Sequence, residues 1–218
     1  MNEYDNEPVR GLPADLPAGE HILWQGEPGT ASMARRVFHA HKASLYFALL
    51  IGLNLALTTA AGRPLAEALQ STLWQAGLAL AGVGLLWLLA WLYARSTVYT
   101  VTNRRIVIRF GVAIPLMINI PLDKVESADL QQYGDGKGNI LLHTRSSARI
   151  SYWSLWPHVR PWHFSQVQPM LRGIDNPAAV AATLAAAVNA DATTAAPAAR
   201  TQRSERSPAG AGAELALS

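Results

Sequence analysis

Histidine is the residue type in this sequence best suited to chemistry. Four of the six histidines form two close pairs, His39 with His41 and His158 with His163. Neutral imidazole is a common metal ligand, so His39 and His41 could hold a metal ion. The favoured interpretation is that they are interfacial histidines among basic neighbours. The chain has no cysteine, which excludes disulfides, thiolate catalysis and cysteine metal sites. No Ser-His-Asp order, carboxylate pair or metal-ligand spacing is present, and we predict no enzyme, no resident cofactor and no metal site.

A glycine-rich segment at residues 133–138 (YGDGKG) has a superficial likeness to a phosphate-binding loop. It lacks the Gly-Lys-Ser/Thr ending and opens no helical pattern, both of which a phosphate loop needs. The spacing of glycines between two β-rich runs is typical of a tight hairpin turn. We therefore expect a turn between two strands here.

Two uncharged apolar segments dominate the chain, at residues 43–61 and 73–94. Each has close to the roughly 20 apolar residues that a helix needs to cross a bilayer. In lipid a helix satisfies its own backbone hydrogen bonds, so the pair at 43–94 predicts a transmembrane helical hairpin. The alternative is a buried helical pair in a soluble domain.

The distribution of positive charge predicts the orientation of this hairpin. The linking segment 62–72 carries only Arg63, offset by Glu67, whereas basic residues flank the outer ends of both helices. The positive-inside rule then places both termini in the cytoplasm, with the protein a multi-pass component of the bacterial inner (intracytoplasmic) membrane. We expect six residues at the membrane surface: Arg35, Arg36, Lys42, Arg95, Arg104 and Arg105.

Small residues recur on both apolar segments and predict close helix packing. They are Ala48, Gly52 and Ala56 on the first segment and Gly77 and Ala81 on the second. Such faces let helices approach closely in membranes, either within the hairpin or against another protein. Asn54 would bond inside the hairpin or face a partner helix, because an unbonded polar group in lipid is costly.

The remaining segments predict a small folded domain and two flanking arms. Residues 1–42 read as an N-terminal arm with a short strand or interfacial segment near 19–28 and a basic surface helix at 31–42. Residues 95–189 read as a domain, with β-rich runs at 96–102, 104–110, 114–121, 125–132, 139–144 and 149–153. A helix at 177–189 presents Val180, Leu184 and Val188 as one apolar stripe that should pack on the sheet. Residues 190–218 are poor in large apolar residues and should be disordered.

Several motifs resemble known protein families. The run 99–106 (YTVTNRRI), followed by Gly111, 120–122 and the Gly138 turn, resembles the bacterial pleckstrin-homology-like domain found beside membrane hairpins. Leu16 and Pro17 with 19–26, and the block 155–162 (LWPHVRPW) with 169–172, are similar to PuhB-type photosynthetic-complex assembly proteins of purple bacteria.

This resemblance implies a PH-like β-barrel or sandwich of seven strands with a C-terminal helix, beside a membrane helical hairpin. It implies a membrane scaffold that helps to assemble the photosynthetic reaction centre and its core light-harvesting antenna, with homodimers consistent with the family. No catalytic residue carries over. The metal at His39 or His41 would then be the magnesium of a bacteriochlorophyll.

Residues 153–173 form an aromatic block interrupted by prolines. This block supplies the candidate partner-binding residues, which are Trp153, Trp156, His158, Arg160 and Trp162. Tryptophan and arginine are favoured anchors at protein interfaces, although these tryptophans could instead fill the end of the barrel and contact lipid. An alternative function is an anionic-lipid-binding PH module that uses Arg104, Arg105 and Arg109. A transporter would need intramembrane charge, and a nucleic-acid partner would need a basic aromatic face; the sequence shows neither.

Overall fold

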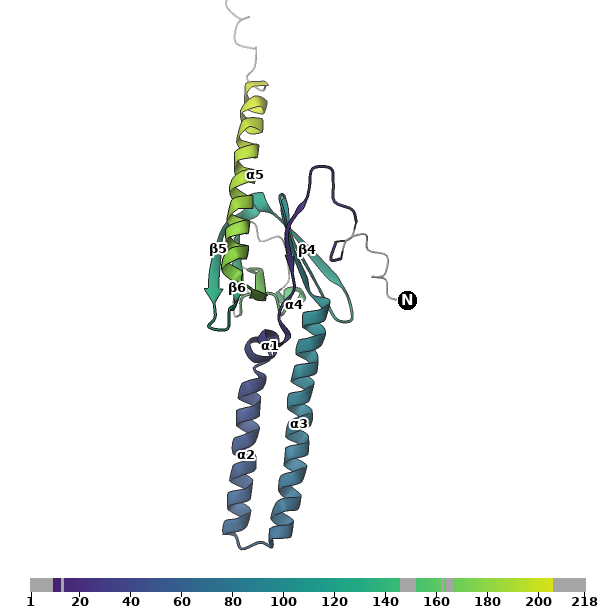
Figure 1. Ribbon diagram of the computed structural model, residues 1–218, viewed down its shortest axis with the longest axis vertical. Coiled ribbons are helices and arrows are strands. Elements are labelled where there is room, and N and C mark those ends of the chain that lie inside the picture. The colour runs from purple at the N-terminus through teal and green to yellow at the C-terminus, as the bar shows by residue number, and fades with distance from the viewer. Residues whose placement is uncertain (1–9, 13, 146–151, 162, 164–166, 206–218) are drawn as a thin grey trace, which may run out of the picture.

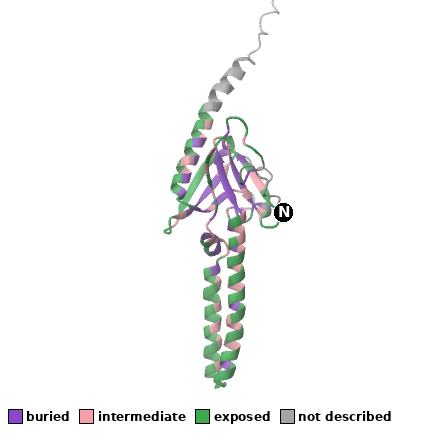
Figure 2. Cartoon of the chain, turned by 45° about the vertical axis from the view of Figure 1, so that its right-hand side comes forward, coloured by how far each residue is buried: buried purple, intermediate pink, exposed green. Residues whose placement is uncertain are grey.

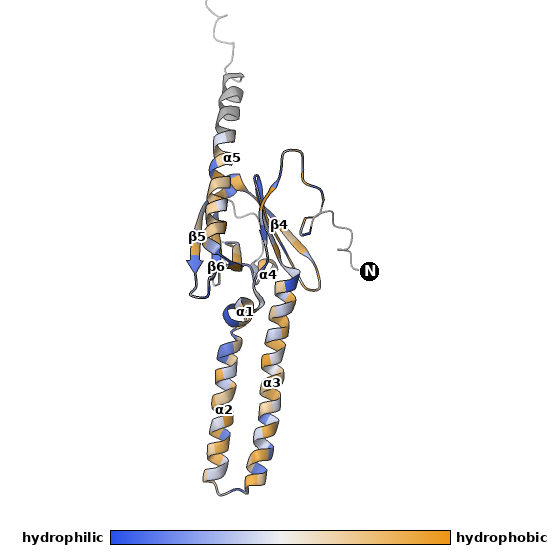
Figure 3. Ribbon diagram, in the orientation of Figure 1, coloured by the Kyte–Doolittle hydropathy of each residue, from blue (hydrophilic) through white to orange (hydrophobic). Residues whose placement is uncertain are grey.

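The computed structural model describes residues 10–12, 14–145, 152–161, 163 and 167–205. Two long helices form a hairpin at one end, and two sheets with a C-terminal helix form a domain at the other (Figure 1). The helices are α2 (Ala40–Ala60) and α3 (Leu65–Ser96). Both are long and apolar enough to cross a membrane, and their side chains are largely exposed (Figures 2 and 3). A core helix of a soluble protein would be buried. The exposure of α2 and α3 therefore argues against the alternative that they are a buried helical pair in a soluble domain.

The hairpin differs from its predicted bounds at the start of the second helix. We expected a link over 62–72, but α3 already begins at Leu65, directly after Pro64. Residues 65–72 are mostly good helix formers, and the charge of Glu67 with the polar run 70–72 (QST) excluded them from the apolar segment.

The first sheet has four antiparallel strands in the order β1-β2-β3-β4. These are β1 (Ile22–Gly26), β2 (Val98–Thr102), β3 (Arg105–Phe110) and β4 (Leu116–Pro121). Because β1 pairs with β2, the helical hairpin is inserted between two neighbouring strands of one sheet. The segment near 19–28 is therefore a strand, and it is part of the domain rather than of a separate arm.

The second sheet has the order β5-β6-β7. Its strands are β5 (Val125–Gln132), β6 (Lys137–Thr144) and β7 (Met170–Asp175). The expected turn at 133–138 joins β5 to β6, as predicted. The strand expected at 149–153 is wrong where the structure describes it, because Tyr152–Leu155 forms the short helix α4. The two sheets remain separate, so a closed barrel is not confirmed and the domain is a PH-like sandwich.

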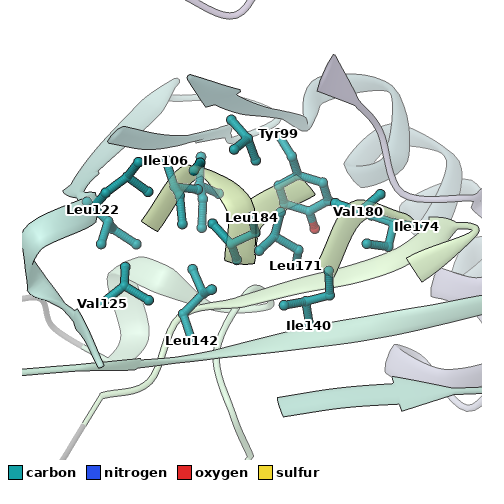
Figure 4. Packing of buried hydrophobic residues seen from close by; sticks show 14 of the residues in the cluster. Tyr99, Ile106, Leu122, Val125, Ile140, Leu142, Leu171, Ile174, Val180 and Leu184 are labelled. Carbon is teal, nitrogen blue, oxygen red and sulfur yellow. The ribbon is translucent and has the colours of Figure 1, made fainter. Parts of the chain in front are cut away.

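The core lies between the two sheets and under helix α5 (Pro177–Glu205). Figure 4 shows inward side chains of both sheets meeting Val180 and Leu184 of α5. The apolar stripe therefore packs as predicted. The disordered tail expected from 190 is wrong as far as Glu205, because α5 continues to that residue. Alanine has the highest helix propensity, and it outweighs the lack of large apolar residues.

A short helical segment connects β1 to the hairpin. It consists of α1 (Thr30–Ser32) and one π-helical turn, η2 (Met33–Val37), and ends at His39 in a left-handed conformation. Met33 and Ala34 are buried against Ala90 and Ala94 of α3. The basic helix predicted at 31–42 is thus divided at His39, and its first half packs on protein. A short 3-10 turn, η3 (Leu122–Lys124), joins β4 to β5 at the opposite end of the domain.

Candidate functional site

The strongest cluster of functional side chains lies where the hairpin meets the sheets. The end of η2 at Phe38, the last turn of α3, the first strand after it and residues 155–161 converge there. Three side chains from these elements form one aromatic group: Phe38, Tyr93 and Trp156. Trp156 meets both other rings edge-on, with centroids 5.9 Å from Phe38 and 5.7 Å from Tyr93. Edge-to-face pairs of this kind add stability beyond apolar burial.

His158 lies at the centre of a buried polar network beside this aromatic group. Its Nε2 is 3.1 Å from the Thr97 hydroxyl, which donates its own proton to the carbonyl of Tyr93. Nε2 must therefore carry the imidazole proton. Nδ1, 2.7 Å from the Tyr99 hydroxyl, is then the acceptor of the proton on that hydroxyl. One neutral imidazole thus joins the end of α3 to β2.

The same network extends to β7. The backbone N–H of Arg172 donates to the Tyr99 hydroxyl at 3.0 Å, and the Arg172 guanidinium donates to the carbonyl of Val159 at 2.7 Å. Burial lowers the pKa of His158 to about 3, and the positive charge of Arg172 acts in the same direction. Burial also raises the pKa of Tyr99. The network is therefore neutral at His158 and Tyr99 and holds the domain against the hairpin.

This burial corrects part of the predicted partner-binding surface. His158 is fully buried, so it cannot dock a partner directly. Trp153 of α4 is 78% exposed, and Trp156 is 40% exposed. Arg160 is half-buried and donates to the Gln168 side chain at 3.1 Å. Trp162 lies outside the described residues. Trp153 and the outer edge of Trp156 are the parts of this surface that a partner could reach.

A second polar contact, made by Arg36 of η2, ties the segment that precedes the hairpin to the second sheet. Its guanidinium donates to Asp135 in the β5–β6 turn at 3.0 Å and lies 3.7 Å over the ring of Tyr133. Desolvation acts to raise the pKa of Asp135, but hydrogen bonds from Arg36 and the Lys137 backbone, with the Arg36 charge, lower it overall. Arg36 therefore faces the domain rather than lipid. The glycine-rich turn supplies this contact.

The other predicted membrane-surface residues separate into two groups. Arg35, Lys42 and Arg95 are exposed at the domain end of the hairpin, where Arg95 lies 5.4 Å over the ring of Trp91. Arg104 and Arg105 lie at the opposite end of the domain, because β2 runs away from α3 before the chain turns. Arg104 and Arg105 are therefore remote from the hairpin, and their contact with lipid stays a prediction.

Arg105 has a different role, which the sequence motif concealed. Its guanidinium donates two hydrogen bonds to the carboxylate of Glu20, at 2.8 and 3.1 Å. The Thr102 hydroxyl donates to the same carboxylate at 2.8 Å, and Asn103 donates to the carbonyl of Gly19. The run 99–106 is thus a structural brace: its residues 102–105, at the β2–β3 turn, hold Gly19 and Glu20, which lead into the edge strand β1. Because Glu20 lies far from Arg105 in the chain, no local sequence pattern indicated this ion pair.

The predicted helix-packing faces point away from the hairpin interior. Ala48, Gly52, Ala56, Gly77 and Ala81 are all exposed. A Cβ added at Gly52 or Gly77 would meet no atom within 4 Å. The hairpin instead buries Ala68, Ala79 and Ala90 of α3, and internal packing by the predicted faces is wrong. Asn54 donates to Ser71 at 3.2 Å, so this amide bonds within the hairpin.

The histidine pair at the start of α2 does not form a metal centre by itself. His39 and His41 are exposed, with ring centroids 6.4 Å apart. Within the described ranges, no group of three or more metal-ligating side chains comes together. Ligation of a bacteriochlorophyll magnesium by either histidine stays a prediction.

Comparison with known proteins is consistent with this architecture. Residues 47–188 match the family model described as "Bacterial PH domain". A Rhodobacter capsulatus protein described as "Uncharacterized 23.7 kDa protein in puhA 5'region" is 38% identical over 202 residues, which cover 87% of this chain and 89% of that protein. No solved structure shows a significant match. The family match begins inside α2, whereas the structure shows that β1 also belongs to the sheet. The chain belongs to the bacterial PH domain family.

Proposed function

We propose that this protein is a membrane-anchored scaffold that helps to assemble the photosynthetic reaction centre and its core light-harvesting complex through protein contacts. The observation that carries the photosynthetic part is the relative whose name places it in the 5' region of puhA, a photosynthesis operon region. The LWPHVRPW block supports the same assignment through its resemblance to PuhB-type assembly proteins. The PH domain family is a non-catalytic kind of module, which fits scaffolding better than catalysis.

The hairpin supports the membrane part of this proposal. Both helices expose apolar side chains along their length, and Arg35, Lys42 and Arg95 gather where they meet the domain. The short link at the other end carries only Arg63. By the positive-inside rule the domain and both termini lie in the cytoplasm, and the protein is a multi-pass component of the bacterial inner membrane.

Two exposed surfaces suit contact with assembly partners. Trp153 projects from α4 at the membrane-facing end of the domain, where it can act as an aromatic anchor. The small-residue face of α2 around Gly52 is open for a partner helix in the bilayer. Confinement of both surfaces beside one membrane raises the effective concentration of nascent subunits. The small-residue face of α2 could instead pack against a second copy of this chain and form a homodimer.

A deletion strain tests this function. We expect lower levels of reaction centre and core antenna in its membranes, measured by absorbance, and recovery when the intact gene is restored. A Trp153→Ala variant should restore these levels less well than a matched Trp87→Ala variant, whose exposed side chain lies on α3 within the apolar span. Normal pigment-complex levels in the deletion strain would contradict the proposal.

The alternative function is recognition of anionic lipid by Arg104, Arg105 and Arg109. Arg109 pairs with Val98, close to the end of α3, and its position is compatible with that function. The positions of Arg104 and Arg105 support it less. Glu20 neutralises Arg105, and both arginines lie at the end of the domain remote from the hairpin. Salt-sensitive binding of the full-length protein to anionic vesicles, lost in Arg104→Gln, would favour that alternative.

A further inference from the structure

The turn between β3 and β4 is unusually apolar for the surface of a cytoplasmic domain. Residues 111–116 read GVAIPL and contain no charged or hydrogen-bonding side chain. Val112 is 45% exposed, Ile114 73% and Leu116 41%. Exposed apolar side chains that stand together mark a surface that contacts a membrane or another molecule.

The turn is also held firmly in place. Gly111 has a φ of 121°, and a Cβ there would lie 2.1 Å from the carbonyl oxygen of Ile114. Only glycine fits this backbone, and it closes the turn tightly. Phe110 and Ile120 anchor the two flanking strands in the core. The turn therefore continues directly from two strands that are anchored in the core.

The sheet register places this turn at the level of the hairpin. Val98, two residues after the end of α3, pairs with Arg109, and Phe110 pairs with Leu116. The tip at Val112 to Ile114 extends roughly 7–10 Å further along the strand direction. A helix covers that distance in about five to seven residues, which reaches back to Trp91 on α3. Figure 1 likewise shows the turn that leads into β4 beside the domain end of α3.

Trp91 and Arg95 mark where α3 leaves the apolar region. Trp91 is partly exposed, and the Arg95 guanidinium lies over its ring. Tryptophan with a neighbouring arginine is typical of the membrane–water interface. Val112 and Ile114 lie level with Trp91, on a turn beside the same helix. Their side chains would therefore reach the same membrane–water interface.

We propose that the β3–β4 turn is a second membrane contact, with Val112 and Ile114 inserted at the boundary between head groups and acyl chains of the cytoplasmic leaflet. This inference rests on the proposed membrane anchoring. The helical hairpin and the turn then hold the domain at two separated points, which sets its tilt and directs Trp153 toward partners. The contact needs no anionic lipid, because the turn has no charged side chain.

The absence of cysteine from the sequence makes a direct test possible. Full-length protein with Ile114→Cys is labelled with an environment-sensitive fluorophore and placed in phosphatidylcholine nanodiscs that contain lipids with a nitroxide quencher near the head group. Asp123→Cys, exposed at the far end of the domain, is the control that should remain in water. Leu80→Cys, exposed in the middle of α3, is the control for the hairpin itself.

We expect a blue-shifted emission and strong quenching at position 114 and little quenching at 123. In a second set of nanodiscs, whose lipids carry the nitroxide deep in the acyl chains, we expect quenching at position 80. The same result at 114 in high salt agrees with an apolar contact. Quenching at 80 without quenching at 114 overturns this inference and leaves the membrane anchoring intact; the turn would then be free for a protein partner. No quenching at 80 overturns both. Circular dichroism of each labelled variant checks that the domain is folded.

Discussion

The brace between Glu20 and Arg105 predicts a large loss of stability when the carboxylate is removed. The Glu20 carboxylate is 2% exposed and accepts hydrogen bonds from Arg105 and Thr102, whereas Arg105 is 30% exposed. Removal of one partner of a buried ion pair costs about 3–5 kcal/mol. Water can reach Arg105 in part, so we expect Glu20→Ala to lower the free energy of unfolding by about 2–3 kcal/mol. For a chain of this size that corresponds to a fall in Tm of about 4–12 °C.

Thermal unfolding of the full-length protein in detergent, followed by far-UV circular dichroism, measures this effect. Glu126→Ala is the matched control, because Glu126 pairs with Arg145 where both side chains are at least half exposed. The control should change the free energy of unfolding by less than about 1 kcal/mol. Equal and small shifts for the two variants would refute the assignment of the motif as a structural brace. A large loss for Glu20→Ala alone would support it.

Three further predictions follow from the junction and the hairpin. Because His158 has a pKa of about 3 in the folded protein and near 6.5 when unfolded, the unfolded chain binds more protons between those values. The free energy of unfolding should therefore decrease as the pH falls below 6.5, by about 2 kcal/mol between pH 7.5 and pH 5. This decrease should be absent in His158→Gln, when chemical denaturation of both proteins is measured at the two pH values. Arg36→Gln removes the contact with Asp135, so amide hydrogen exchange in the β5–β6 turn should accelerate; unchanged exchange would mean that the contact does not hold the turn. Gly52→Leu should leave the unfolding temperature in detergent unchanged, whereas Ala90→Leu, at a fully buried site, should cost about 1–3 kcal/mol; the reverse order would contradict the packing described.

Local patterns predicted much of this fold. The β-branched runs gave β2 and β3 nearly residue by residue, and the regular spacing of short strands gave β5. The glycines at 134–138 correctly indicated a hairpin turn. The stripe of Val180, Leu184 and Val188 predicted the packed face of α5. These features depend on the period of one element, and a single segment contains all the information required.

Pairings between distant segments could not be predicted in this way. Glu20 and Arg105 are 85 positions apart, and the hairpin separates β1 from its partner β2. β7 was missed because proline and aromatic residues precede it in the same block. The side of α2 that meets α3 was also not predictable, because both helices are apolar all round and carry small residues on several faces.

In the candidate site, too, local patterns predicted some features, whereas others depend on residues far apart in the chain. Exposed Trp153 fits the predicted anchor, whereas His158 resembles a surface ligand in sequence and is buried in the structure. Its burial depends on Thr97, Tyr99 and Arg172, which come from three separate elements. Sequence alone identified the block as important, and the structure divides it into a buried support and an exposed face.

Crosslinking from Trp153 tests the central claim most directly. A photo-crosslinking amino acid at this position, in the full-length protein within intact photosynthetic membranes, captures whatever protein the exposed face contacts. The same amino acid at Asp123, at the far end of the domain, is the control. We predict that reaction-centre or core antenna subunits are captured from position 153 and not from 123. Efficient crosslinking at 153 that yields only lipid, or only proteins unrelated to the photosynthetic complexes, would contradict the account.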